Sequence, residues 1–211
     1  MKIIMLLSGL FTMFFCLCGN NVAGSETTNG DQIIVIASKG SIYGTAPVGH
    51  TIYLFSSDYC PYNDSGFSST AIADSSGAFS FNNLEIGEYA VYCKLADSDL
   101  SVFVKLMLNR SDGWGIADTV FAFGENGSFS GKLTDATGVP LSLYDVYIPG
   151  SPFFTVTDSS GGFVIDSVPE GNYRVYFSKS SNDINSPTKS RKIIEVTIEA
   201  GKKTVVDPVT F

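Results

Sequence analysis

One phrase occurs twice in this sequence, 84 residues apart, and the repeat constrains the fold more than any other feature. "DSSGAFSFNNLEIGEYAVY" begins at Asp74, and "DSSGGFVIDSVPEGNYRVY" begins at Asp158. Across the aligned segments 71–92 and 155–176, nine of 22 positions are identical. Only two copies at so large a spacing indicate two whole domains, not the stacked layers of a solenoid.

Each shared residue type has a mechanical role. Asp-Ser-Ser-Gly predicts a tight turn, because Asp and Ser hydrogen-bond to nearby backbone and Gly tolerates positive φ. Phe79 and Phe81 then fall on one face of a strand, since side chains alternate with a period of two. Gly87 marks a second turn, and Tyr89 and Val91 begin the next strand. The phrase therefore predicts an antiparallel hairpin in each copy.

The flanking segments have the same character. "KIIEVTIEAG", residues 192–201, alternates apolar and polar residues like a strand with one wet face. "LSVFVKLML", residues 100–108, has one fully apolar face and a second face on which Phe103 and Met107 are apolar. No segment beyond the N-terminus has a helical period, and each copy holds about seven short strands. We predict an all-β protein with two tandem antiparallel β-sandwich domains.

The pattern divides the chain as follows: a signal peptide with a helical core at 1–24, a linker at 25–30, a first repeat at 31–123, a second linker at 124–127, and a second repeat at 128–211. The second linker, Gly-Glu-Asn-Gly, is polar, contains glycine and is short. We therefore expect the two repeats to lie end to end with limited freedom. Phe103 and Met107 are candidates to pack at the junction, with ordinary surface apolar residues as the alternative.

The N-terminus has the layout of a secretory signal peptide. Lys2 is followed by a nearly uninterrupted apolar stretch, residues 3–15, and Val22-Ala23-Gly24 offers small residues for cleavage before Ser25. The apolar stretch is shorter than the roughly 20 residues of a membrane-spanning helix, which makes an uncleaved anchor the weaker alternative. A third possibility is lipidation of Cys18 in "CLCGN", although Leu17 is a poor residue before a lipidated cysteine. The protein is thus expected to be secreted or held in the cell envelope, with lipid anchoring at the outer surface as the alternative.

The charge balance argues against nucleic acid as a partner. The chain has 21 acidic and 13 basic residues, a formal net charge of −8, and no basic stripe to neutralise phosphates. Charged residues make up 16% and aromatic residues 13%, which is typical of a folded β-rich protein. No later stretch is long and apolar enough to cross a membrane, so the mature chain is expected to lack a transmembrane span.

A family resemblance is carried by "GKLTDATGVPLSLYDVYIPGSPFFTVTDSSGGFVIDSVPEGNYRVYF", residues 131–177. This segment resembles a carboxypeptidase regulatory-like domain, a prealbumin-like sandwich with an Ig-like arrangement of strands. The first repeat resembles the family more loosely, because "GSIYGTAPVGHTIYLF" lacks the usual opening motif. The resemblance implies an accessory module of secreted and surface proteins without catalytic machinery. It also implies a carbohydrate-binding-like fold, since related sandwiches bind carbohydrate and others serve as stalks.

The residues themselves offer little for catalysis. His50 is the single histidine, and no cysteine or acidic residue stands close to it in sequence, so a turn or strand-entry role is expected. No nucleotide-binding or HExxH metal motif occurs, and no Asp-x-Asp-x-Asp-Gly pattern for calcium. We expect no enzyme activity, no cofactor and no metal.

Two cysteines remain after removal of the signal peptide, Cys60 and Cys93. An even pair in an exported chain predicts a disulfide between them, which would stabilise the fold by roughly 3–4 kcal/mol on the chain-entropy model. The alternative is two free thiols.

Loop aromatics are the candidate ligand contacts. Tyr59 and Tyr62 lie in "DYCPYNDSGF", and Trp114 is the only tryptophan. Sugar rings stack on exposed aromatic faces while polar neighbours bind the hydroxyls. We therefore predict an exported, non-catalytic structural or interaction module with a protein or glycan partner at the cell surface. The alternative is a carbohydrate-binding protein that uses these three loop residues.

Overall fold

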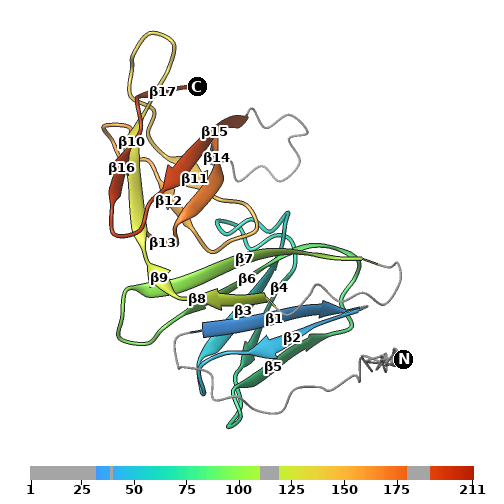
Figure 1. The fold of residues 1–211 in the computed structure, drawn as a ribbon. Coiled ribbons are helices and arrows are strands. Elements are labelled where there is room, and N and C mark those ends of the chain that lie inside the picture. Colours follow the sequence, from blue (N-terminus) through green and yellow to red (C-terminus); the bar gives the residue numbers. More distant parts are fainter. Residues whose placement is uncertain (1–31, 39, 110–118, 180–190) are drawn as a thin grey trace, which may run out of the picture.

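The computed structural model describes residues 32–38, 40–109, 119–179 and 191–211. The predicted signal peptide, the first linker, Cys18 and Trp114 lie outside these ranges. Within them the chain forms strands and turns and no helix, which confirms the all-β prediction (Figure 1). The strands are β1 (Gln32–Ser38), β2 (Ser41–Thr45), β3 (Thr51–Ser56), β4 (Ser68–Ile72), β5 (Ala78–Asn82), β6 (Gly87–Lys94), β7 (Leu100–Leu108), β8 (Thr119–Ala122), β9 (Gly124–Glu125), β10 (Gly127–Thr134), β11 (Tyr144–Tyr147), β12 (Phe154–Val156), β13 (Gly162–Val168), β14 (Gly171–Lys179), β15 (Arg191–Ile198), β16 (Lys203–Val205) and β17 (Val209–Thr210).

The first repeat packs two sheets face to face. One has the strand order β5-β2-β1-β8, and the other has the order β4-β3-β6-β7-β9. Between them lies an apolar core in which Ile42, Ile52, Leu54 and Val91 are fully buried. Burying alternate residues of each strand in this way provides the main stabilisation of a sandwich.

The second repeat is also built from two sheets, but part of its pairing differs from the prediction. Its sheets have the orders β13-β10-β16 and β12-β11-β14-β15, and β17 also pairs with β10. Both β16 and β17 run parallel to β10, so the expectation of purely antiparallel sheets was wrong there.

The physical reason for the parallel pairing is visible in the first repeat. There β1 inserts between β2 and β8 and is antiparallel to both, so β2 and β8 point the same way. In the second repeat no strand takes the place of β1 within the described residues, and β16 joins β10 directly. The direction of β16 relative to β10 is therefore the same as that of β8 relative to β2, and the intervening strand accounts for the parallel pairing of β16.

The repeated phrase performs the same task in both copies. The carboxylate of Asp74 accepts hydrogen bonds from the Ser76 backbone and hydroxyl, and Asp158 does the same with Ser160. The glycine that closes the second of these turns, Gly161, has a φ of 73°. A Cβ at this glycine would lie only 2.3 Å from the Leu133 carbonyl oxygen, so the turn has no room for a side chain.

The repeated tyrosine is also used twice in one way. The Tyr89 hydroxyl donates to the Glu85 carbonyl, and the Tyr173 hydroxyl donates to the Pro169 carbonyl, both at 2.9 Å. Each bond closes the corner before a central strand, the arrangement known as a tyrosine corner in β-sandwiches.

A third turn of the same kind precedes the second hairpin and was not recognised from the sequence. Asp135 in "DATG" accepts hydrogen bonds from the Thr137 hydroxyl and from the backbone of Thr137 and Val139. Together Asp74, Asp135 and Asp158 are called the turn aspartates below. Hydrogen bonds to each carboxylate lower its pKa, with the neighbouring Ser or Thr hydroxyl as the largest cause.

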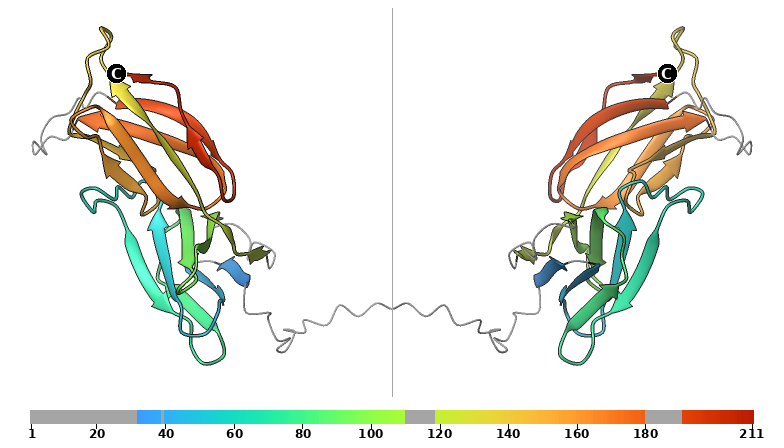
Figure 2. Two further views of the ribbon diagram at one scale, coloured as in Figure 1. Left: turned by 90° about the vertical axis from the view of Figure 1, so that its left-hand side faces the viewer. Right: turned by 90° about the vertical axis from the view of Figure 1, so that its right-hand side faces the viewer.

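The second repeat stands with one end against the first, as Figures 1 and 2 show. The strands β6 and β7 of the first repeat cross beneath that end. Residues 124–127, expected to form a linker, are strand β9, the buried Asn126 and the start of β10, and β9 pairs with β7. The division of the chain into two domains, at residues 31–123 and 128–211, stays a prediction.

Candidate functional site

The junction between the repeats is built on the outer face of one sheet of the first repeat. Along β3, β6 and β7, one set of alternate residues points into the core, and the other set faces the second repeat. This outer set includes Phe55 and Tyr92, which are buried, and Phe103, which is partly buried. All three pack with the core of the second repeat, so the second apolar face of residues 100–108 has a structural role. The prediction that Phe103 packs at the junction is confirmed, whereas Met107 is 39% exposed and does not belong to this cluster.

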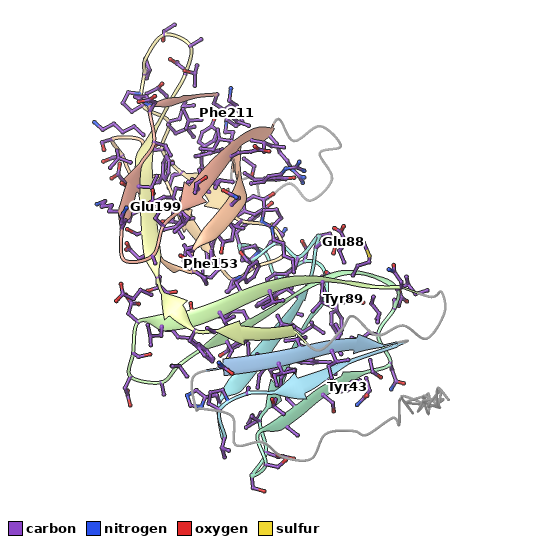
Figure 3. The ribbon with its side chains drawn as sticks, in the orientation of Figure 1. Tyr43, Glu88, Tyr89, Phe153, Glu199 and Phe211 are labelled. Carbon is purple, nitrogen blue, oxygen red and sulfur yellow. The ribbon has the colours of Figure 1, made fainter. Side chains whose placement is uncertain are left out.

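The second repeat contributes the loop between β11 and β12 to this junction. Phe153 lies at the end of the second repeat that faces the first (Figure 3). Its ring meets Tyr92 at 5.4 Å between centroids with an 82° angle, and meets Phe103 at 6.0 Å. Phe103 also contacts Tyr173, at 6.0 Å. Edge-to-face pairs of this kind add to the stabilisation from burial, about 0.5–1.5 kcal/mol each.

A loop of the first repeat likewise packs on the second repeat. The loop between β3 and β4 is the counterpart of the β11–β12 loop, and it places Tyr62 on Tyr147, 5.2 Å between ring centroids. The two loops also bond directly, because the Gly150 amide donates to the Tyr59 carbonyl at 2.8 Å. Each repeat therefore rests a loop on a sheet of the other, and the junction is held at two places.

The connecting strand is fixed by polar contacts as well. Asn126 is buried, its amide nitrogen donates to the Asp99 carboxylate at 3.2 Å, and its side-chain oxygen accepts from the Ser101 hydroxyl. The backbone amide of Asn126 donates to the Asp99 carbonyl at 3.0 Å. Ser167 of the second repeat also donates to the Asp99 carboxylate, at 3.3 Å. Since buried polar groups are costly unless they are bonded, this network favours one geometry of the connector.

Beside the junction lies a cleft of about 760 Å³ with walls from both repeats. The first repeat lines it with the outer face of β6 and β7, including Glu88, Lys105 and Met107. The second repeat lines it with β14, β15 and the segment around Pro149, including Arg174. The sequence did not predict the cleft, because each of its walls has the pattern of a solvent-exposed strand face and the cleft exists only where the two repeats meet.

The predicted disulfide is not formed. Both Cys60 and Cys93 are free and buried. Cys93 lies opposite Ile52 in the β3–β6 ladder, whereas Cys60 follows Ser56 at the other end of β3. Four residues of strand span about 13 Å, and a disulfide requires Cα atoms within about 7 Å. Burial raises the pKa of Cys93 to about 12 and also raises the pKa of Cys60, which disfavours the reactive thiolate at both positions.

The candidate sugar contacts fall in different places. Tyr59 is 9% exposed, packs on Phe55 at 4.8 Å, and donates its hydroxyl to Asp64 at 2.9 Å. It offers no exposed ring face. Tyr62 packs on Tyr147 at the junction, and Trp114 lies outside the described residues. The sequence indicated loop aromatics, but it gave no sign that a second domain would cover them.

His50 has contacts typical of a loop histidine. Its Nε2 accepts a hydrogen bond from the Ala96 amide at 3.3 Å, and its Nδ1 lies 3.2 Å from the Val48 carbonyl oxygen. The described ranges contain no group of three or more His, Cys, Asp or Glu side chains placed to hold a metal ion. Nor do those ranges contain a helix long and apolar enough to cross a membrane.

Comparison with solved structures gives distant matches. The minor pilin GBS52 of Streptococcus agalactiae is 16% identical, with 79% of this chain and 84% of that chain covered and a TM-score of 0.36. The Bacillus anthracis TIE protein is 14% identical over 88% of this chain and 41% of that chain, with a TM-score of 0.31. The shaft pilin SpaA of Lactobacillus rhamnosus GG is 10% identical over 85% and 99%, with a TM-score of 0.28.

Comparison of sequences is more informative for the second repeat. None of the curated proteins matches the chain. The family model of the carboxypeptidase regulatory-like domain matches residues 128–210, which are nearly the whole of the second repeat. The resemblance predicted from residues 131–177 is confirmed there, and the model match does not extend to the first repeat. Residues 128–210 of this chain are thus similar to the carboxypeptidase regulatory-like domain.

Proposed function

We propose that this protein is an exported, non-catalytic module that holds two β-sandwiches in one fixed relation and presents their surfaces at the cell surface or outside it. The observation that carries the proposal is the reciprocal junction, in which Phe153 packs on the first repeat and Tyr62 packs on the second. A flexible tether would need neither contact. The signal-peptide pattern of residues 1–24 supports export.

The proposal includes a common origin of the two repeats as copies of one carboxypeptidase regulatory-like module. Three equivalences support it. The Asp turns and the tyrosine corners form the same hydrogen bonds in both copies. The ladders also share a register, since Tyr53 pairs with Tyr92 in the first repeat and Tyr147 pairs with Tyr176 in the second. Partners on this view are proteins or glycans at the cell surface.

Residual dipolar couplings of the full chain test the fixed geometry. A rigid junction gives one alignment tensor for both repeats, because neither moves relative to the other. Two unrelated tensors for the two repeats would overturn the proposal. Mass spectrometry of the exported chain tests the location, since a new N-terminus at Ser25 supports secretion and a diacylated Cys18 supports lipid anchoring.

Glycan binding through Tyr59 and Tyr62 is not supported by their positions. Tyr59 is buried, and Tyr62 packs on Tyr147. Trp114, the third predicted contact, lies outside the described residues and stays a prediction.

A further inference from the structure

The cleft beside the junction has the size of a ligand site. Its volume of about 760 Å³ falls within the roughly 300–1,000 Å³ of typical ligand pockets. Clefts between domains are favoured positions for such sites, because two surfaces contribute groups to one space. Glu88 lies on the side of the first repeat that faces the second (Figure 3).

The wall from the second repeat carries polar side chains that are largely exposed to solvent, 71% for Arg174 and 82% for Glu195. Arg174 pairs with Glu195 across β14 and β15, with 3.6 Å between Nε and Oε1. In the neighbouring row, the Thr197 hydroxyl donates to Asn172 at 2.7 Å. Tyr176 lies in the row on the other side of Arg174; Tyr147 packs on it at 5.6 Å between ring centroids, and its partly exposed remainder lines the cleft. Cross-strand pairing fixes the spacing of these groups along the wall.

The wall from the first repeat carries a positioned cation. The Lys105 ammonium lies 5.7 Å from the centre of the Tyr173 ring and 6.0 Å from that of Phe103. This cation–π contact ties Lys105 to the aromatic junction, so the same rings that join the repeats also place a donor in the cleft. Met107 and Pro149 add apolar surface nearby.

The charges that line the cleft balance. Lys105 and Arg174 are cations, and Glu88 and Glu195 are anions, so the formal sum is zero. A polyanion or a polycation would meet two groups of its own sign there. The strands β6 and β14 each have a neighbour on both sides, so their part of the walls offers side chains and not a free strand edge, whereas β15 is an edge strand.

We propose that this cleft binds an uncharged, hydroxyl-rich ligand, namely a neutral oligosaccharide. Hydroxyl groups both donate and accept, which suits an alternation of carboxylates with guanidinium, ammonium and amide groups. The apolar face of a sugar ring packs against Tyr176, Met107 and Pro149, and the polar groups orient it. This site is distinct from Tyr59 and Tyr62, and it adds a binding activity to the proposed module of two fixed β-sandwiches.

Amide-shift mapping on the full chain tests the proposal. The probes are neutral hexasaccharides of glucose, mannose and N-acetylglucosamine, with a heparin hexasaccharide as the charged comparison. The expected result is a change of amide shifts confined to β6, β7, β14 and β15 with at least one neutral probe. The Arg174→Gln and Glu195→Gln variants each remove one charged hydrogen-bonding group and should weaken that binding about 10-fold. Lys203→Gln, on an exposed position of the other sheet, should leave it unchanged.

Several results would overturn the proposal. They are the absence of shifts with every neutral probe, shifts that map elsewhere, preference for the heparin probe, and affinities that Arg174→Gln and Glu195→Gln leave unaltered. The mapping uses the unmodified chain, so it stays decisive if a variant fails to fold. If no ligand binds, the proposed fixed relation of the two β-sandwiches is unaffected, because the alignment tensors test that relation and ligand binding does not.

Discussion

Replacing Phe153 by alanine is expected to destabilise the junction far more than replacing its neighbour Phe154. Phe153 is 7% exposed and contacts Tyr92 and Phe103, whereas Phe154 is 48% exposed. Truncating a buried phenylalanine costs about 3–5 kcal/mol, and an exposed substitution usually changes stability by about 0.5 kcal/mol or less. For a chain of this size the first loss corresponds to a fall of roughly 6–20 °C in melting temperature.

Thermal and urea unfolding followed by circular dichroism, together with dipolar couplings, measure the effect. Phe153→Ala should lower the melting temperature and separate the alignment tensors of the two repeats. Phe154→Ala, an identical change one residue away, serves as the matched control. Equal melting temperatures for the two variants, or a single tensor in Phe153→Ala, would refute the view that this ring joins the repeats.

Three further outcomes are expected. The turn aspartates have pKa values below the ordinary 3.8, so the stability they provide is present above about pH 3.8 and is lost as pH falls through their lower folded values. Urea midpoints measured from pH 5 downward check this, and a midpoint independent of acid would contradict it. Burial raises the pKa of Tyr92 from 10.0 to about 12, so the folded state holds its proton more tightly than the unfolded state. The stability that Tyr92 provides should therefore be fully present below pH 10 and decline toward pH 12, and a Tyr92 ring that ionises well before unfolding, as followed by its own NMR signals, would be inconsistent with this burial. Finally, Cys60 and Cys93 should resist a thiol-reactive label in the native protein and should both react in denaturant without reductant. A denatured chain that remains unlabelled until it is reduced would restore the disulfide.

The repeated phrase allowed the fold to be predicted because each of its residues acts locally. An Asp turn, a positive-φ glycine and a strand of alternating residues depend on neighbours within a few positions. The alternation in residues 192–201 likewise predicted which side chains of β15 are buried: Val196 and Ile198 are 4% and 2% exposed. What failed depended on distant parts of the chain. In the first repeat β1 separates β2 from β8, whereas in the described part of the second repeat β16 pairs directly with β10 and runs parallel to it. No local pattern in the sequence predicts this difference.

The candidate site was less accessible to prediction for the same reason. Loop aromatics such as Tyr59 have the composition of a ligand surface, and only docking of the second repeat reveals that they are packing residues. Conversely, Arg174 and Glu195 have the composition of a solvated strand face, and their sequence does not indicate that this face borders a cleft between the repeats. Phe103 was the exception, since an aromatic residue on a face that should be wet is itself a sign of a partner.

The contact of a loop from each repeat with the other repeat also limits how such a protein can change. Two domains without such contacts would accumulate substitutions independently. Here an altered loop in one copy alters the surface that supports the other, so an acceptable change at Phe153 requires a complementary change around Tyr92 and Phe103. Substitutions in the two halves are therefore coupled. Replacing either half by an unrelated β-sandwich would succeed only if the replacement supplied both a complementary loop and a complementary sheet face.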